Sequence, residues 1–250
     1  MKHLKTEALV IRSQSYSEAD KLLTLLTLEG GKIPSIARGA CKTKSKLSAS
    51  VELFTRGDFL LYRGRTLATV TQGEILNSFY SLRMDLLSYA YGQYFCELIG
   101  RLLEENEPCP KEYRLFLSAL EAMNGDTAYL EVLARSFELK LVKNLGYTPY
   151  LDSCLVCSTQ KTPFRLSFRE GGLLCSKCSM RDPGANKITP GTLSLLAKLL
   201  TADFKRLRIL KMNSKQRQEI FSINQALLSY NFNLGRCKAL AFLEQLGCSR

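Results

Sequence analysis

Histidine and tryptophan are the scarcest residues of this 250-residue chain, which has one His and no Trp. The single histidine, His3, lies beside the N-terminus, and a Ser-His-Asp or Cys-His catalytic arrangement would have to be built there. A phosphate-binding G-x-x-x-x-G-K-[ST] loop and an H-E-x-x-H metal motif are both missing, and the acidic residues form no obvious two-metal cluster. The sequence therefore predicts a protein that is not an enzyme.

Long apolar runs are missing as well. The longest run falls far short of the ~18 residues that a membrane helix requires. The N-terminal segment MKHLKTEALVIRSQSYSEAD reaches Glu7 and then polar residues before an apolar signal segment could form. The 9 cysteines are an odd number, which argues against a complete disulfide framework and suits a reducing compartment. We expect a soluble, cytoplasmic protein.

Positive charge is abundant, with 35 Lys and Arg against 23 Asp and Glu and a formal charge of +12. Residues 1–80 carry 12 basic and 7 acidic side chains, residues 81–180 carry 11 and 12, and residues 181–250 carry 12 and 4. The excess therefore lies at the two ends of the chain. A polyanionic partner, such as nucleic acid or an acidic protein surface, accounts for an excess of this size.

The pattern of apolar residues changes near residue 77. Before it, five short runs rich in Thr, Val, Ile and Leu, separated by glycine turns, predict a small β-barrel or sandwich. After it, apolar residues at helical spacing predict one long helix from about 78 to 106, then helices near 111–124, 126–145, 190–202, 214–230 and 234–246. An irregular segment, 150–184, interrupts the helices. The expected fold class is α+β.

Four cysteines in the irregular segment have the spacing of metal ligands: Cys154, Cys157, Cys175 and Cys178. Each C-x2-C pair can place two thiolates on one metal ion, and two pairs complete a tetrahedron of sulfurs. Four sulfur ligands leave no open position, so the spacing indicates structural zinc, which can contribute roughly 10–16 kcal/mol of folding free energy. A redox dithiol and an iron–sulfur cluster are the alternatives.

The segment ARGACKTKSKLS, residues 37–48, holds four cations and no acid, and it lies between two predicted strands. Further cations fall on neighbouring strands, and Tyr16, Phe54, Phe59 and Tyr62 are candidates for an aromatic surface. A small barrel with a basic track and aromatic side chains is typical of proteins that hold single-stranded nucleic acid without sequence choice. The candidate phosphate contacts are Arg12, Arg38, Lys42, Lys44, Lys46, Arg56, Arg63 and Arg65.

These features together resemble the RecO family of DNA repair and recombination mediators. YSEADKLLTLLTLEGGK (16–32) and DFLLYRGRTLATV (58–70) are similar to the barrel strands of the family, and ARGACKTKSKL (37–47) is similar to its basic loop. LRMDLLSYAYGQYFCEL (82–98) resembles the first helix of its helical domain, and the four cysteines match its zinc-bearing members. Cys41 departs from the pattern, because members often carry a basic residue there.

The resemblance implies an N-terminal OB-fold barrel (1–78), a helical domain in two parts (79–149 and 185–250) and an inserted four-cysteine zinc ribbon (150–184). It implies binding to single- and double-stranded DNA, annealing of complementary strands and a nucleoid-associated location. It further implies partnership with RecR, contact with the acidic tail of single-stranded-DNA-binding protein, and help in loading the RecA recombinase. An RNA- or transcription-associated zinc-ribbon adaptor is the alternative, and a metal-dependent nuclease is a third class.

Overall fold

The computed structural model describes residues 3–123 and 129–247, which form two compact units. The first unit contains the described residues up to 123 together with residues 237–243. The second contains the described residues from 129 to 236 and those from 244 onward. Within this part of the chain, no helix combines the length and the apolar character needed to span a membrane.

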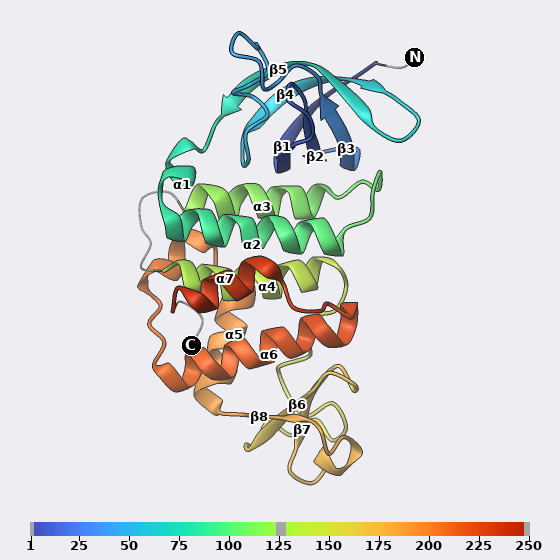
Figure 1. The fold of residues 1–250 in the computed structure, drawn as a ribbon. Coiled ribbons are helices and arrows are strands. Elements are labelled where there is room, and N and C mark those ends of the chain that lie inside the picture. The colour runs from blue at the N-terminus through green and yellow to red at the C-terminus, as the bar shows by residue number, and fades with distance from the viewer. Residues whose placement is uncertain (1–2, 124–128, 248–250) are drawn as a thin grey trace. The chain divides into compact units, whose positions relative to one another are not determined.

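A closed five-stranded barrel occupies the N-terminal part of the first unit (Figure 1). Its strands are β1 (His3–Ser15), β2 (Lys21–Thr27), β3 (Gly31–Ala37), β4 (Arg56–Arg63) and β5 (Ala68–Asn77), in the order β1-β2-β3-β5-β4. All neighbours pair antiparallel except β3 and β5, which pair parallel. Alternate side chains, such as Val10, Leu25, Phe59 and Leu61, fill the interior. The five-stranded barrel and the α+β class confirm the predicted fold class.

Helices α1 (Tyr80–Met84), α2 (Leu86–Leu102) and α3 (Pro110–Ala122) follow the barrel in the same unit, with α2 and α3 lying side by side (Figure 1). The prediction of one continuous helix from 78 is wrong, because Asp85 is extended and separates α1 from α2. The Asp85 carboxylate accepts a hydrogen bond from the Ser88 N–H at 2.8 Å and so caps α2. Helix α7 (Lys238–Gln245) returns to this unit from the far end of the sequence.

A glycine in α2 makes room for an aromatic ring from the barrel side. Phe54 is fully buried and has a left-handed backbone conformation, with φ 71°. A Cβ atom at Gly92 would lie 2.6 Å from the Cζ atom of Phe54, which is too close for any side chain. Packing of Phe54 against α2 therefore requires glycine at position 92.

Substitution of Gly92 tests this packing. Gly92→Ala is expected to lower the free energy of unfolding by about 1–3 kcal/mol, because the added methyl group overpacks the site. Gly100→Ala in the same helix is the matched control, since a Cβ there meets nothing within 4 Å. Removing a glycine from a helix interior should stabilise the control by up to about 1 kcal/mol. Urea unfolding of both variants measures the difference, and equal stabilisation of the two would contradict the packing argument.

The second unit contains α4 (Leu130–Asn144), α5 (Pro190–Thr201) and α6 (Ser214–Phe232), which pack on one another. A small sheet of β6 (Phe164–Ser167), β7 (Gly172–Cys175) and β8 (Asn186–Ile188) lies between α4 and α5 in the sequence, in the order β7-β6-β8. Short 3-10 turns cover Ser179–Arg181 and Phe204–Ile209. Thr189 caps α5 and Pro190 occupies its first turn, as the sequence predicts.

Candidate nucleic-acid interface and metal centre

The basic segment, residues 37–48, lies in the connection from β3 to β4 and is held against the barrel. Ala40 is buried in the barrel core, and Leu47 packs against that core. The backbone N–H of Gly39 donates a hydrogen bond to the Asp20 carboxylate at 2.8 Å, which ties the segment to the β1–β2 turn. The apolar and small residues of the segment therefore fix its path, and its charged side chains are left outside.

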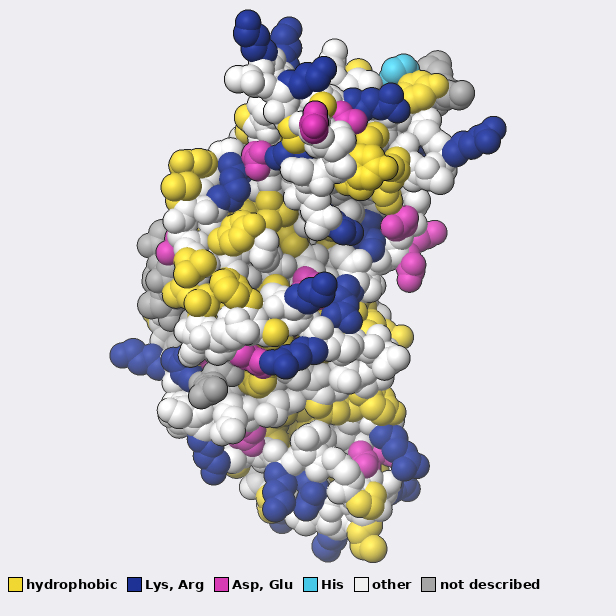
Figure 2. Space-filling model, viewed as in Figure 1, with side chains coloured by type: hydrophobic (Ala, Val, Ile, Leu, Met, Phe, Trp, Pro, Cys, Tyr) yellow, Lys and Arg dark blue, Asp and Glu magenta, His cyan; other side chains and the backbone are white. Residues whose placement is uncertain are grey.

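The four cations of this segment are Arg38, Lys42, Lys44 and Lys46, and all four are exposed. Among the residues that the structure describes, no carboxylate forms an ion pair with any of them. In Figure 2, basic side chains stand out from the barrel into solvent. Their charge is thus available to an external anion.

Arg63 and Arg65 lie at the turn between β4 and β5. Both side chains are exposed, and neither forms an ion pair within the described ranges. Gly64 allows the turn to close, since a Cβ atom there would lie 2.3 Å from the carbonyl oxygen of Leu67. The turn therefore presents two unpaired guanidinium groups.

The two groups of cations lie on loops that connect to the same pair of strands, β3 and β5, at opposite ends of that pair. Ser35 pairs with Ala68 in the parallel contact between β3 and β5. Strand β3 leads directly into the basic segment, and β5 leaves the turn that carries Arg63 and Arg65. Because the two strands run parallel and the end of β3 pairs with the start of β5, the two loops leave the pair in opposite directions.

Arg12 lies on β1, where the pairing with β2 shifts register between Val10 and Arg12. Its side chain is exposed and donates a hydrogen bond to the Gln14 side-chain oxygen at 2.8 Å. Gln14 is neutral, so the charge of Arg12 is not compensated by this contact.

Arg56 differs from the other candidates because its partners are internal. Its Nε atom donates to the Glu7 carboxylate at 2.8 Å, and the Tyr113 hydroxyl from α3 donates to the same oxygen at 2.6 Å. The hydrogen bond from Arg56 lowers the pKa of Glu7, and burial is the main cause that raises the pKa of Tyr113. This half-buried arrangement joins β1, β4 and α3, so it gives Arg56 a structural role.

The aromatic residues divide into two pairs. Phe54 and Phe59 are fully buried, so the expectation that they form part of an aromatic surface is wrong. Both rings serve the packing of the first unit instead. Tyr16 and Tyr62 are 65% and 38% exposed, and Tyr62 lies edge-on to the His3 ring at 5.3 Å. These two tyrosines remain accessible to a stacked base.

The four cysteines of the second unit converge at one point. Strands β6 and β7 form a hairpin that ends at Cys175, and the segment before β6 brings Cys154 and Cys157 alongside. All four Sγ atoms, including that of Cys178, lie within 4.8 Å of one another, and Cys157 and Cys175 are separated by 3.7 Å. The sulfurs of a tetrahedral site with ~2.3 Å bonds are roughly 3.8 Å apart. The cluster therefore has the size of a four-sulfur metal site.

Backbone groups and mutual repulsion set the ionisation of these thiols. Burial opposes ionisation of Cys154, but N–H groups, first that of Cys175 at 3.3 Å, lower its pKa to about 6. A hydrogen bond to the Cys175 sulfur raises the pKa of Cys178 to about 12, because four thiolates cannot be crowded together without a compensating charge. A bound dication supplies that charge, so the donor set fits a metal ion.

Sequence inspection did not locate a basic cavity in the first unit. Arg83, Arg101 and Lys238 contribute to it from α1, α2 and α7, with Arg12 from the barrel. No local motif connects residues so far apart in the chain, so only the fold could reveal the cavity.

The chain matches two family models. The model described as "Recombination protein O N terminal" matches residues 1–79, and "Recombination protein O C terminal" matches residues 83–240. Together the two matches cover most of the chain.

Relatives described as "DNA repair protein RecO" align along nearly the whole chain. That of Alkaliphilus metalliredigens is 38% identical over 228 residues, which cover 91% of this chain and 92% of the relative. That of Symbiobacterium thermophilum is 34% identical over 250 residues, with 98% of both chains covered. That of Desulforudis audaxviator is 36% identical over 250 residues, which cover 100% of this chain and 99% of the relative.

Proposed function

Because this chain belongs to the RecO family of DNA repair proteins, we propose that it is a recombination mediator that binds single- and double-stranded DNA and anneals complementary strands. One observation carries the proposal. Six cations on two loops of the barrel are exposed and have no carboxylate partner within the described chain: Arg38, Lys42, Lys44, Lys46, Arg63 and Arg65.

Neutralisation of phosphates is the physical basis of annealing. Two complementary strands repel each other through their backbones, and a surface that binds both lowers this repulsion so that bases can pair. Lys and Arg contacts to phosphate position a strand without reading its sequence. The exposed rings of Tyr16 and Tyr62 are available to stack with unpaired bases. No catalytic residue is needed, so we propose that the protein is not an enzyme.

Seven of the eight candidate contacts enter this interface. Arg12 joins the six loop cations because its hydrogen-bond partner is neutral. Arg56 is the weakest candidate, since a phosphate would have to compete with Glu7 for its guanidinium group. DNA contact by Arg56 remains a prediction.

We further propose that the four cysteines hold a structural Zn²⁺ ion. Cys154, Cys157, Cys175 and Cys178 would hold it, and bound zinc would fix the segment before β6 to the end of β7. The support is the closed four-sulfur set at tetrahedral size, which leaves no position for a reacting water.

The partners are proposed on electrostatic grounds. In the second unit, Lys205, Arg206, Arg208, Lys211 and Lys215 are exposed close together in sequence around Ile209, which is 87% exposed. An acidic peptide with apolar side chains complements such a surface, as does the acidic tail of single-stranded-DNA-binding protein. Binding to RecR and help in loading RecA complete the proposed role, which places the protein at the nucleoid.

The proposed organisation has four segments. Residues 1–78 form the DNA-binding barrel, residues 79–149 and 185–250 the two parts of the helical domain, and residues 150–184 the zinc ribbon. The division assigns DNA binding to the first segment and acidic partners to the last.

Annealing of complementary oligonucleotides coated with single-stranded-DNA-binding protein tests the function. Addition of this protein is expected to raise the annealing rate at least tenfold, because in its absence the coat shields each strand from its complement. The same mixture with Mg²⁺ and labelled DNA should yield no cleavage products. No acceleration, or a strong preference for structured RNA over DNA, would favour the adaptor alternative, and accumulating products would favour a nuclease.

A further inference from the structure

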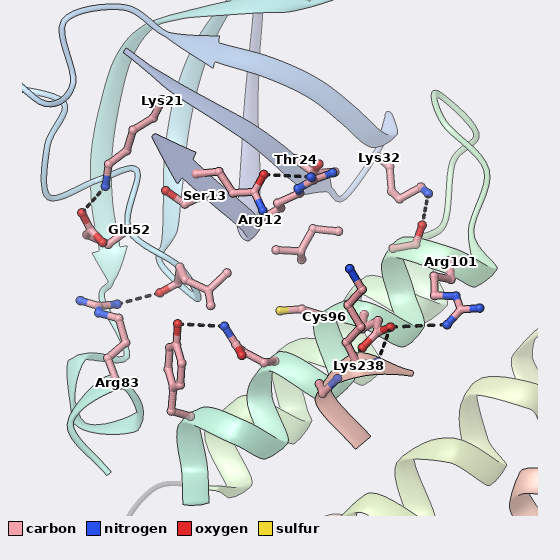
Figure 3. Close-up of a pocket in the computed structure, with 18 of the residues that line it drawn as sticks. Arg12, Ser13, Lys21, Thr24, Lys32, Glu52, Arg83, Cys96, Arg101 and Lys238 are labelled. Carbon is pink, nitrogen blue, oxygen red and sulfur yellow. Dashed lines mark hydrogen bonds and ion pairs between the residues drawn. The ribbon is translucent and has the colours of Figure 1, made fainter. Parts of the chain in front are cut away.

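A cavity of about 670 Å³ lies between the barrel and the helices of the first unit (Figure 3). Residues of β1 and β2 form one wall, and residues of α2 with the start of α7 form the other. All of the lining residues belong to the same compact unit. Its volume falls within the range of about 300–1,000 Å³ that is usual for small-molecule sites.

Basic side chains dominate the walls. Three lining residues are acidic, namely Glu52, Glu97 and Glu105. Six are basic, namely Arg12, Lys21, Lys32, Arg83, Arg101 and Lys238. Like charges gathered in a partly enclosed space repel one another more strongly than they do in open water, so a net excess of three positive charges favours a bound anion.

Two of the acidic residues already have partners. Lys21 and Glu52 form an ion pair at 2.6 Å. The Glu97 carboxylate accepts hydrogen bonds from the backbone N–H groups of Lys238 and Ala239 at 3.0 and 2.9 Å. Its negative charge therefore compensates the partial positive charge at the N-terminus of α7. Arg101 also lies 3.4 Å from Glu97.

Lys32 is attracted by the nearby carboxylate of Glu105, but two other cations of the walls have no carboxylate partner in the described chain. Arg12 is bonded to a neutral amide oxygen, and no carboxylate in the described ranges pairs with the Lys238 ammonium group. Lys32 is only 8% exposed, and its ammonium group donates to the Gly100 carbonyl at 2.6 Å. The Ser13 hydroxyl has no hydrogen-bond partner among the described residues, although it is buried.

We propose that this cavity binds a small molecule that carries several phosphate groups, such as a nucleoside triphosphate or an inorganic oligophosphate. Three or four negative charges on adjacent phosphates match the excess of three positive charges. The planar guanidinium group of Arg12 suits bidentate contact with phosphate oxygens, and Lys238 supplies a point charge from the opposite wall. Tyr89, Ile11 and Leu53 also line the cavity and offer a less polar area for a base.

Such a ligand would connect parts of the chain that are distant in sequence. Arg12 belongs to β1 and Lys238 to α7, so one anion held by both would bridge the barrel and the returning C-terminal helix. The inference does not depend on the proposed annealing function. It does predict that the ligand and DNA share Arg12.

Isothermal titration calorimetry of the full-length protein tests the proposal with tripolyphosphate, ATP and AMP as separate probes. Sodium sulfate at matched ionic strength is the control for screening. We expect saturable binding of tripolyphosphate and ATP with one site per chain, and binding of AMP that is at least tenfold weaker. Equal affinities for ATP and tripolyphosphate would identify phosphate recognition alone, and tighter binding of ATP would identify an additional contact with the base. Binding no stronger than that of sulfate would overturn the proposal.

Two variants assign the binding to the cavity. Lys238→Ala is expected to weaken oligophosphate binding roughly tenfold, the loss typical of one charge-assisted hydrogen bond. Lys238→Gln keeps most of the side-chain stem and should show the same loss, because the proposal assigns binding to the charge; full affinity in Lys238→Gln would attribute the loss in Lys238→Ala to a disturbed α7 and overturn the assignment. Lys198→Ala removes an exposed cation of α5 outside the cavity and should leave the affinity unchanged. Single-stranded DNA affinity should stay within about twofold in Lys238→Ala, and a loss as large as that for oligophosphate would make the cavity part of the DNA interface and overturn the proposal.

Discussion

Simultaneous replacement of Lys42, Lys44 and Lys46 by alanine is expected to flatten the salt dependence of single-stranded DNA binding. Each phosphate contact contributes about −0.7 to the slope of log affinity against log salt concentration, so three contacts account for about 2 units of slope. All three side chains are exposed and lack carboxylate partners in the described chain, so their charge is fully available to phosphates. Fluorescence anisotropy of a labelled oligonucleotide from 50 to 300 mM salt measures the change.

A second triple variant controls for the loss of net charge. Lys111, Arg114 and Lys198 are exposed cations on α3 and α5, and their replacement by alanine removes the same charge from other surfaces. The slope should change by much less than 1 unit in this control. An unchanged slope in the loop variant would remove the segment from the interface, and an equal change in both variants would attribute the effect to overall charge.

Removal of the proposed zinc ion is expected to unfold the ribbon while the barrel stays folded. Structural zinc contributes roughly 10–16 kcal/mol in small zinc-binding peptides, and few other contacts could compensate for its loss. After chelation, or in Cys154→Ala, a protease should cleave within residues 150–188 far faster than in the untreated protein. Binding of single-stranded DNA should remain, because the loop cations belong to the other unit.

Metal analysis completes this test. Mass spectrometry of the native protein should show one zinc ion per chain, and Cys41→Ser, which changes an exposed cysteine outside the cluster, should retain it. Iron with visible absorption would identify a cluster instead of zinc. Protein without metal that resists the protease would contradict the structural role of the site.

Local patterns predicted those parts of the fold that short segments determine. Short runs rich in Thr, Val, Ile and Leu between glycine turns predicted the five strands of the barrel, and Thr189 followed by Pro190 predicted the start of α5. The spacing of the four cysteines predicted their convergence, because two C-x2-C turns and a hairpin are nearly sufficient to build the cluster. These signals act over a few residues, so the sequence displays them directly.

Partners that are distant in sequence could not be predicted in this way. The charge pattern placed Arg56 among the exposed cations. In the structure Arg56 bonds to Glu7, 49 residues away, and Glu7 also accepts from Tyr113, 106 residues away from it. The pattern of apolar residues gave no sign that the Phe54 ring packs in the space left by the missing side chain of Gly92. The basic cavity depends on contacts between β1, α2 and α7, which only the complete fold brings together.

The cap that Glu97 provides for α7 has a consequence for synthesis of the protein. The Glu97 carboxylate belongs to α2, whereas the N–H groups from which it accepts, those of Lys238 and Ala239, are synthesised 141 and 142 residues later. The N-terminal half can therefore collapse during translation, but it acquires α7 only after residues 238–245 have emerged from the ribosome. A transcript truncated shortly before codon 238 would yield a chain whose oldest part is left incomplete.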